Sequence, residues 1–435
     1  MVNIVQITPG AGGMYCGNCF RDNALVGALR ARGHTTLMVP LYLPLTLDEA
    51  SQSAGTPTFF GGVNVYLDQV LPLYRKAPAW LRRWLDSPAL LRKAAGRAAK
   101  TRAAEVGALT LSMLRGEEGN QTRELEELVQ WLSAQPAMPE VVILSNALLL
   151  GLARRIHERT GAAVVCTFQG EEAFVNGFPP AERQTTWELM AQRARDIHLF
   201  IAPSRYYAEV MGRALRLEAH HVVVVPNGIS LEGYIPVERT GPAGDSPVLG
   251  YFARMCPEKG LDLLIEAYLA LKKPGRLPRL RLKVGGGCGP ADEPFVARLQ
   301  ERLARAGVLG DCTFHPNLDR AAKIDFYQSL DVLSVPALYG EAFGLYVIEA
   351  MAAGVPVVQP RHAAFPEILE ATGGGLLCEP NAAALADTVE RLLKDEPLRR
   401  QLGAAGRRAV ERDFHLERMA ENMERALAQA ARRGA

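Results

Sequence analysis

The sequence predicts an α/β protein with two doubly wound parallel-sheet domains, and three observations support this prediction. The chain has 435 residues, whereas one hydrophobic core usually stops growing at about 250–300 residues. Within its first forty residues, an apolar run, a glycine-rich loop, a helical pattern and a second apolar run follow one another. The same order of elements returns after residue 247. Such alternation is typical of parallel sheets with crossover helices.

The elements of the first domain follow from local patterns. Val2–Ile7 is an apolar run that predicts a strand, and the loop 8–13 after it is rich in glycine. A helical pattern then runs as far as Gly33, and Thr36–Val39 predicts the next strand. Residues 71–134 have helical patterns and no strand pattern. We therefore expect a helical insertion in the first domain.

The segment 240–247 is rich in glycine and proline and has no apolar period, so it predicts the domain boundary. The domains expected from it are 1–240 and 247–413, and the second opens with a strand at Val248–Phe252. The further strands expected in it are Leu280–Val284, Cys312–His315, Val332–Val335, Pro356–Val358 and Gly375–Cys378. Residues 414–435 are helical with no strand after them.

Composition narrows the class of protein. The chain is 48% hydrophobic and 22% charged, which excludes disordered and fibrous proteins. Its 49 Lys and Arg nearly balance its 47 Asp and Glu, so no nucleic-acid partner is expected. No apolar run reaches the 18 or more residues of a membrane span, and the first residues do not form a signal peptide. Seven scattered cysteines are typical of reduced thiols, and we expect a cytoplasmic protein.

One segment departs from this balance. Residues 75–102 contain nine Lys or Arg and, as the single acidic residue, Asp86. Trp80, Trp84 and several leucines are interleaved with these charges. Two interpretations stay open: an amphipathic helix lying on an anionic membrane, or a solvated insertion whose apolar side chains pack on their own domain.

The loop after the first strand places Gly12 and Gly13 at a strand-to-helix turn. Glycines let the backbone approach a ligand closely, and the amides at a helix start favour an anion. The spacing is not G-x-G-x-x-G, and the second strand is not followed by an acidic residue that would hold a ribose. A dinucleotide fingerprint is therefore not favoured, and a turn that only the fold requires is the alternative.

Two cations flank the turn after the first strand of the second domain. Arg254 and Lys259 are five residues apart at the carboxyl end of that strand. From there both could converge on a diphosphate, while two solvated loop charges are the alternative. The next strand leads into the glycine-rich loop Gly285–Gly289.

Glu341 and Glu349 lie eight residues apart around a predicted helix start. If both were helical, they would be separated by a rise of about 12 Å, too far for the carboxylate pair of a retaining glycosidase at roughly 5–5.5 Å. A better arrangement places Glu341 before the helix, the amides of Phe343, Gly344 and Leu345 at its positive end, and Glu349 further along. One ligand with a polar ring, a phosphate and a ribose could then contact all three.

Together these motifs carry a resemblance. They are Thr8–Gly13, Gly33–His34, Ala202–Ser204, Val225–Gly228, Arg254 with Lys259–Gly260, Val284–Gly287, Glu341 with Glu349, and Ala353–Pro356. In this order, and over nearly the whole chain, the sequence resembles the family-4 retaining glycosyltransferases of GT-B fold. The resemblance implies two Rossmann-like domains facing a central cleft. It also implies that the last helix crosses back to the first domain.

The resemblance implies a role for each candidate residue. The second domain would bind a nucleotide-diphosphate sugar, with Arg254 and Lys259 neutralising the diphosphate, Glu349 holding the ribose and Glu341 the sugar ring. The other donor-binding residues would be Gly12, Gly13, Gly286, Phe343, Gly344 and Leu345. A hexosyl group would pass, with retention, to a hydroxyl of a saccharide, lipid or small-molecule acceptor. Fixed cations and helix amides would stabilise the leaving group, so no cofactor and no metal are expected.

The chain departs from the family on the acceptor side. After the strand Val164–Thr167 the family often has a histidine, whereas Gln169 and Glu171 follow here and are the acceptor-side candidates. Gln169 can form hydrogen bonds but cannot act as a base. His315 and Asn317 fall in a loop where the family often contacts the nucleobase.

Cys16 and Cys19 form a C-x-x-C at a helix start, where a redox pair could work. The alternative is two thiols packed beside the loop, since a zinc site would need two more ligands.

Two other functions remain alternatives. One is a GT-B protein of different chemistry, such as a nucleotide-sugar epimerase, a phosphorylase or an enzyme similar to glycogen and starch synthases. The other is a non-catalytic nucleotide-sugar-binding protein or membrane scaffold. Whichever function holds, residues 75–102 could make a peripheral contact with the inner membrane face. The intact set of Arg254, Lys259, Glu341 and Glu349 favours an enzyme.

Overall fold

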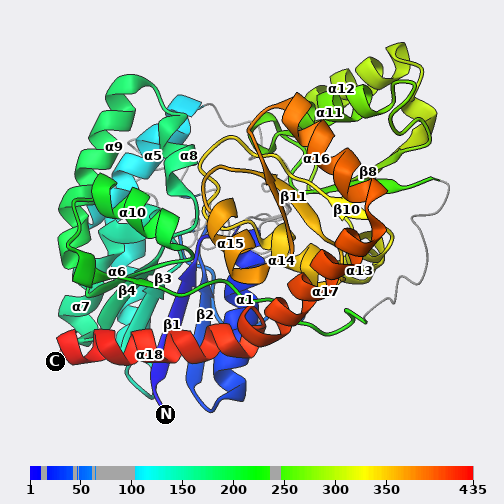
Figure 1. Cartoon of the computed structure of the whole chain (residues 1–435). Coiled ribbons are helices and arrows are strands. Elements are labelled where there is room, and N and C mark those ends of the chain that lie inside the picture. Colours follow the sequence, from blue (N-terminus) through cyan, green and yellow to red (C-terminus); the bar gives the residue numbers. More distant parts are fainter. Residues whose placement is uncertain are drawn as a thin grey trace. The chain divides into compact units, whose positions relative to one another are not determined.

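The computed structural model describes residues 1–10, 17–42, 47, 49–60, 64, 103–235 and 246–434, with side chains left out at 103–106 and 434 (Figure 1). Several predictions fall outside these residues: the turn at Gly12 and Gly13, Cys16, the basic segment 75–102, and residues 240–245 of the expected linker.

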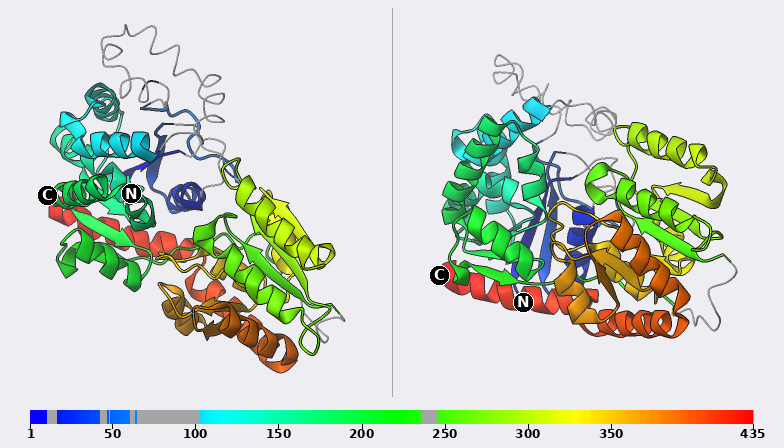
Figure 2. Two further views of the ribbon diagram at one scale, coloured as in Figure 1. Left: turned by 90° about the horizontal axis from the view of Figure 1, so that it is seen from above. Right: turned by 45° about the horizontal axis from the view of Figure 1, so that its top comes forward.

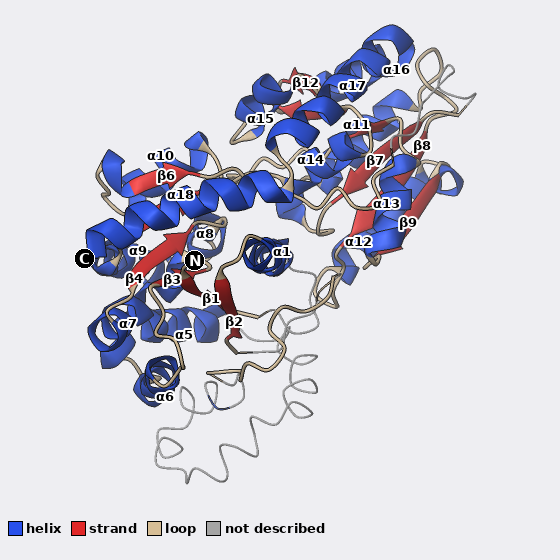
Figure 3. Ribbon diagram, turned by 90° about the horizontal axis from the view of Figure 1, so that it is seen from below, coloured by secondary structure: helices blue, strands red, loops and turns tan. Residues whose placement is uncertain are grey.

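The chain forms two compact units, each with its own parallel sheet. The first unit comprises Met1–Pro226 and Met419–Ala435, and the second comprises Asn227–Arg418. The chain thus passes from the first unit to the second after Pro226, earlier than the expected boundary at 240–247, and residues 227–235 belong to the second unit. Each sheet has six strands, drawn in red in Figure 3. The predicted α/β class with two doubly wound sheets is confirmed.

The first sheet has the strand order β2-β1-β3-β4-β5-β6. Its strands are β1 (Asn3–Thr8), β2 (Thr35–Pro40), β3 (Val141–Leu144), β4 (Ala163–Thr167), β5 (Leu199–Ala202) and β6 (Val222–Val224). The central strands are apolar runs buried on both faces, as parallel sheets require. The order reverses between β1 and β3, so the loops after these two strands leave the sheet on opposite sides of one crevice.

Helices cover both faces of this sheet (Figure 2). They are α1 (Gly17–Ala31), α5 (Ala103–Arg115), α6 (Thr122–Ser133), α7 (Ala153–Thr160), α8 (Glu171–Asn176), α9 (Pro180–Arg193), α10 (Arg205–Ala214) and α18 (Leu416–Gly434), with short 3₁₀ turns η2 (Gly116–Glu118), η3 (Ala147–Leu152), η4 (Ala194–Asp196) and η5 (Ala219–His221). The described part of the expected insertion is helical, as α5, η2 and α6. Arg193 of α9 secures it, because its guanidinium donates to the carbonyl of Leu114 at 3.0 Å and pairs with Glu117 at 3.3 Å.

The second sheet has the order β12-β11-β10-β7-β8-β9. Its strands are β7 (Val248–Phe252), β8 (Arg281–Gly286), β9 (Cys312–Pro316), β10 (Val332–Leu333), β11 (Val357–Pro360) and β12 (Gly375–Cys378). Counted along the chain this is the order 3-2-1-4-5-6 of doubly wound nucleotide-binding folds. The order reverses between β7 and β10, where a crevice for a ligand is expected.

All the strands expected in the second domain are present, but β10 is shorter than the predicted Val332–Val335. The amide of Val335 donates to the side-chain oxygen of Gln359 at 3.1 Å. A side chain from β11 therefore takes the place of a ladder hydrogen bond, and the strand ends early.

The helices of the second unit follow its strands in alternation. They are α11 (Leu261–Leu271), α12 (Glu293–Arg305), α13 (Arg320–Gln328), α14 (Leu345–Ala352), α15 (Phe365–Thr372), α16 (Ala382–Lys394) and α17 (Glu396–Asp413), with 3₁₀ turns η6 (Pro257–Lys259) and η7 (Leu309–Asp311). Among the described helices of either unit, none is both long and apolar enough to cross a membrane.

Candidate active site

Three candidate residues lie at the point where the order of the second sheet reverses. Arg254 follows β7 by two residues, and Lys259 ends the turn η6 after it. Glu341 lies between β10 and the start of α14. Because parallel strands present their carboxyl ends at one edge, the two loops that carry these side chains leave the sheet at the same edge.

Lys259 and Glu341 form the centre of this cluster. The ammonium Nζ of Lys259 lies 2.6 Å from Oε2 of Glu341. The same oxygen accepts hydrogen bonds from the hydroxyls of Tyr346 at 2.8 Å and Tyr339 at 3.1 Å. Lys259 also contacts the Tyr339 hydroxyl and lies 4.8 Å from the centroid of that ring. The carboxylate of Glu341 is thereby held in one orientation in a buried place.

The charge state of Glu341 follows from these contacts. Burial alone would raise the pKa of its carboxyl, but the charge of Lys259 and the hydrogen bonds from Lys259, Tyr346 and Tyr339 outweigh burial and hold the pKa below its ordinary value. Glu341 is therefore ionised at neutral pH. Burial and the Glu341 charge raise the pKa of Tyr346 well above its ordinary value, so its hydroxyl remains a hydrogen-bond donor.

Arg254 is fixed along one edge by Asp292. Its Nε lies 3.2 and 3.1 Å from the two carboxylate oxygens, and its terminal nitrogen lies 2.9 Å from one of them. Asp292 is buried, and it also accepts the amide of Gly289 at 3.1 Å. The Arg254 side chain nevertheless stays 57% exposed. Its guanidinium is thus oriented by one anion and still accessible to another. No local sequence pattern marks Asp292.

A close backbone contact requires a glycine at position 286, and the sequence alone did not reveal this contact. Its φ is +119°, and a Cβ atom there would lie 2.0 Å from the carbonyl oxygen of Ala253. Only glycine allows the end of β8 to run against the backbone just before Arg254. Gly286 therefore shapes the loop that carries Arg254, and its contact with a donor stays a prediction.

The segment before α14 has the layout that the sequence predicted. Gly344 precedes the helix with φ +88°, and Leu345 is its first residue. Phe343 is buried, and its ring lies 6.2 Å from that of Phe414. The amides at this helix start form a positive end beside Glu341.

Glu349 is held by two residues of α13. The ammonium of Lys323 lies 3.1 Å from one of its oxygens, and the hydroxyl of Tyr327 donates to the other at 2.7 Å. Lys323 is 4% exposed. The two partners are four residues apart and so occupy one face of α13. The four-residue spacing could have indicated that Lys323 and Tyr327 act together. Neither residue, however, lies close in the sequence to another candidate for the site.

The acceptor-side candidates lie in the first unit after β4. Glu171 is buried, and its oxygens accept the amides of Ala147 at 2.9 Å, Gln169 at 2.9 Å and Gly170 at 3.0 Å. Burial raises the pKa of Glu171 despite these bonds. Glu171 thus shapes the turn that presents Gln169. The side-chain amide of Gln169 is oriented with its oxygen toward Arg21 and its nitrogen toward Asn18. It then accepts a hydrogen bond from Arg21 at 3.0 Å and donates one to Asn18 at 3.1 Å.

A buried carboxylate that the sequence analysis did not single out joins the ends of β1 and β3. The hydroxyls of Thr8 and Ser145 donate to Asp22 at 2.9 and 2.5 Å. Arg21 pairs with the other oxygen of Asp22 at 3.3 Å. Burial raises the pKa of Asp22. This network lies where the order of the first sheet reverses.

The remaining candidates lie in α1, in β9 and in the loop after β9. Cys19 is buried in α1. His315 contacts the hydroxyl of Thr313 at 3.0 Å. The side chain of Asn317 bonds both the amide and the carbonyl of Cys288, at 3.0 and 2.9 Å, and so ties the loop after β9 to the loop after β8.

Two doubly wound parallel sheets, with Arg254, Lys259 and Glu341 after strands at the reversal point of the second, define a two-domain protein of the GT-B class. Residues 237–409 match the family model for glycosyl transferases group 1, and residues 100–232 match the model for glycosyltransferase family 4. The chain belongs to the family-4 glycosyltransferases of GT-B fold, as its motifs predicted.

Two relatives illustrate how far the similarity extends. The chain is 32% identical to a D-inositol 3-phosphate glycosyltransferase of Xylanimonas cellulosilytica over 54% of its own length and 57% of the relative's. It is 29% identical to a GDP-mannose-dependent α-(1-6)-phosphatidylinositol monomannoside mannosyltransferase of Mycolicibacterium smegmatis, over 60% and 68%. The chain therefore spans about half the length of the first of these relatives.

Solved structures share the fold over nearly the whole chain. A sucrose-phosphate synthase of Thermosynechococcus elongatus is 20% identical with a TM-score of 0.68, covering 99% of each chain. HepE of Anabaena, solved with UDP-glucose, is 15% identical with a TM-score of 0.68, covering 98% of this chain and 100% of that one. At these identities the likeness shows the fold alone.

Proposed function

We propose that this chain is a retaining glycosyltransferase that moves a hexosyl group from a nucleotide-diphosphate sugar to a hydroxyl acceptor. The observation that carries the proposal is the pairing of Lys259 with Glu341, with Arg254 on the same loop as Lys259, where the second sheet reverses its order. The site offers two cations for a diphosphate and an ionised carboxylate for a sugar hydroxyl.

The basic residues act on the leaving group. Arg254 presents its exposed edge to the diphosphate while Asp292 holds the other edge. Lys259 shares its charge between Glu341 and the developing phosphate charge, and the amides at the start of α14 add to it. Such fixed charges cost no reorganisation during the reaction, so the proposal requires neither a cofactor nor a metal at this site.

The two glutamates orient the donor. Glu341 accepts hydrogen bonds from hydroxyls of the transferred sugar, because its carboxylate is ionised and held in place. Glu349 accepts the ribose hydroxyls, with Lys323 and Tyr327 fixing its oxygens. Retention follows in the proposal from attack on the face that the diphosphate leaves, with the leaving phosphate taking the acceptor proton.

The first donors to test are UDP-glucose and GDP-mannose. HepE was solved with UDP-glucose, and the mycobacterial relative is named for GDP-mannose. The names of the relatives also suggest an acceptor with a polyol headgroup, free or attached to a lipid. A panel of UDP-, GDP- and ADP-sugars, measured by thermal shift and donor hydrolysis, selects among the bases and sugars.

Two variants test the proposal. Glu341→Ala should abolish transfer with nucleotide binding retained, and Glu349→Ala should mainly weaken nucleotide binding. Glu370→Ala is a matched control, because Glu370 is exposed on α15. Full activity in both site variants sinks the assignment. Nucleotide binding without turnover of any sugar donor would favour the non-catalytic alternative.

A peripheral contact with the inner membrane face, through the basic segment 75–102, is also part of the proposal. It rests on the nine Lys and Arg of that segment. Flotation with vesicles rich in phosphatidylglycerol should recover the protein at low salt, and replacing Arg82, Arg83, Arg92 and Lys93 by Ser should abolish recovery. Equal recovery of the two forms contradicts a role for the segment.

A further inference from the structure

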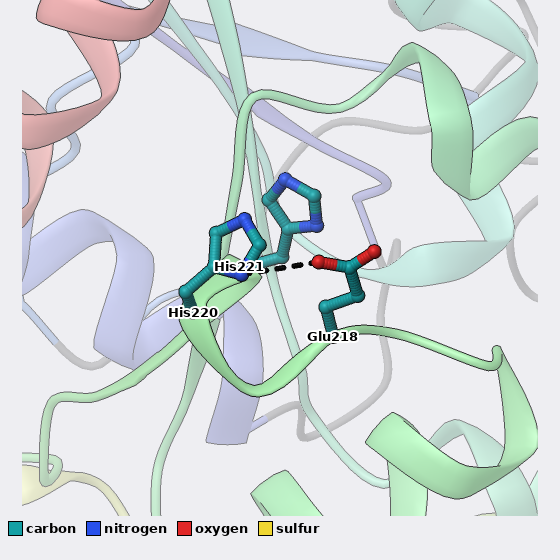
Figure 4. Close-up of side chains that lie close together, drawn as sticks. All are labelled: Glu218, His220 and His221. Atoms are coloured by element: carbon teal, nitrogen blue, oxygen red, sulfur yellow. Dashed lines mark ion pairs between the residues drawn. The ribbon is translucent and has the colours of Figure 1, made fainter.

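A cluster of three metal-binding side chain types lies on the surface turn between α10 and β6. Figure 4 shows Glu218, His220 and His221 on the same side of this turn. One ligand atom from each lies within 4.8 Å of the other two. A carboxylate oxygen of Glu218 lies 3.2 Å from Nδ1 of His220. Among the described residues this is the single group of its kind.

The two histidines are neighbours in the chain and their rings lie close together. In a strand, His220 and His221 would point to opposite faces. They belong instead to the 3₁₀ turn η5, and their imidazole centroids are 4.1 Å apart.

We propose that Glu218, His220 and His221 form a binding site for a divalent transition-metal ion, with Zn²⁺ as the preferred ion. Two imidazoles and one carboxylate are a ligand set that zinc uses with an open fourth position. The two imidazoles are close enough for one metal ion to bind a nitrogen of each. Exposed Glu218 and His220 require only side-chain rotation to close on the ion.

Nearby charges are arranged compatibly. Arg433 of α18 does not occupy Glu218 but donates to the carbonyls of His220 at 2.9 Å and His198 at 3.3 Å. These bonds fix the turn from its main-chain side. The side chains of the cluster stay available for an ion.

A cavity borders the cluster. Glu218 and His221 are part of the lining of a cavity of about 430 Å³, together with apolar residues such as Phe200 and Leu215. Arg195 and Arg216 also line it. Water or a small anion entering from this cavity supplies the remaining ligand of the ion.

The cluster belongs to the first unit, whereas Arg254, Lys259, Glu341 and Glu349 belong to the second. The proposed metal site therefore does not rest on the proposed transfer reaction, and either can fail without the other.

Calorimetric titration of the full-length, untagged, chelator-dialysed protein with Zn²⁺ tests the site. One equivalent should bind saturably, and His220→Ala and His221→Ala should each weaken this binding at least tenfold. His415→Ala is the matched control: His415 contacts Glu417 at 2.8 Å in the same kind of exposed pair but is not part of such a group. This variant should bind as the unmodified chain does.

A spectroscopic measurement separates the site from the seven cysteines of the chain. Co²⁺ bound at Glu218, His220 and His221 should give visible d–d bands without a thiolate charge-transfer band. A strong thiolate band overturns the assignment. So does a Zn²⁺ affinity that is unchanged in the His220→Ala/His221→Ala double variant.

Thermal unfolding shows whether a variant loses Zn²⁺ binding because it is misfolded. In EDTA, His220→Gln should unfold at the same temperature as the unmodified chain, because His220 is exposed. Added Zn²⁺ should raise the unfolding temperature of the unmodified chain alone. If Zn²⁺ raises both equally, the ion binds elsewhere and the proposal fails.

Discussion

At the scale of single residues, both cations of the candidate active site already have carboxylate partners. Lys259 is paired with buried Glu341, and Arg254 is paired with buried Asp292. In the proposed reaction, the donor diphosphate would therefore share each cation with a carboxylate. The pairing orients the cations beforehand, which would lower the ordering cost of donor binding. Removing either carboxylate therefore also leaves a cation without its partner.

Glu341→Gln should lower the free energy of unfolding at pH 7 by about 2 kcal/mol, because Lys259 then lacks its partner. The pKa of Glu341 lies below its ordinary value, so the pair stabilises the fold above the ordinary carboxyl pKa. That contribution disappears as the pH falls through the lowered pKa. Denaturant unfolding of both proteins between pH 7 and pH 3 should show the difference narrowing with acidity.

Glu370→Gln, on exposed α15 surface, controls for the general effect of removing a carboxylate. It should leave the unfolding free energy within about 0.5 kcal/mol at every pH. A constant difference between Glu341→Gln and the unmodified chain from pH 7 to pH 3 would contradict the ion-pair explanation.

Asp292→Asn should weaken binding of a nucleoside diphosphate about tenfold, because Arg254 loses its charged guide. Isothermal titration with UDP and GDP measures this, and Glu293→Gln is the control on the exposed neighbouring residue. If Asp292 merely competed with the ligand for Arg254, the variant would bind more tightly. That result would refute a positioning role.

The residues that carry charge toward a ligand could be predicted from the sequence, whereas most of their partners could not. Arg254, Lys259, Glu341 and Glu349 follow strand ends or flank a helix start, and these patterns are local. Asp292 lies 38 residues from Arg254. It meets Arg254 because β7 and β8 are neighbours in the sheet. Such pairings depend on strand order, which local patterns do not specify.

At the scale of elements, the loops after strands are positioned by close backbone contacts. A Cβ atom at Gly286, at the end of β8, would lie 2.0 Å from the carbonyl oxygen of Ala253. A Cβ atom at Gly260, just before α11, would lie 2.2 Å from the carbonyl oxygen of Pro336, which follows β10. The loops after β7, β8 and β10 are thus packed backbone to backbone. The sequence shows that glycines gather in these loops, but the contacts that require them are visible only in the structure.

Gly286→Ala should destabilise the second unit by about 1–3 kcal/mol and reduce donor binding more than tenfold. The reason is that its Cβ would lie 2.0 Å from a carbonyl oxygen at a φ of +119°. Thermal unfolding and nucleotide titration measure the two effects.

Gly289→Ala is the control within the same loop, since its Cβ would lie 3.7 Å from the nearest atom, a carboxylate oxygen of Asp292. Equal effects of Gly286→Ala and Gly289→Ala would show that the loop is sensitive to any side chain rather than to this close approach.

At the scale of the whole molecule, the chain completes its first unit last. The first unit includes Met419–Ala435, although the second unit lies between them and the rest of the first in sequence. Glu424 of α18 binds Arg32 through both carboxylate oxygens at 2.7 Å and contacts His34 at 2.8 Å. Sequence patterns predicted a final helix without a strand, and the family resemblance suggested which domain it joins.

The buried face of α18 explains what its loss would do. Met419, Met423 and Leu427 are four residues apart, lie on one stripe, and are 3% exposed or less. Met423→Ala combined with Leu427→Ala should lower the unfolding free energy of the first unit by about 4 kcal/mol or more. The second unit, whose core does not include these residues, should keep its stability. Calorimetry should then show the transition of the first unit moving to lower temperature while that of the second stays in place.

Glu421→Ala combined with Arg425→Ala, on the same helix, should shift neither by more than a small amount. A single transition that moves as a whole would mean instead that the two units unfold as one.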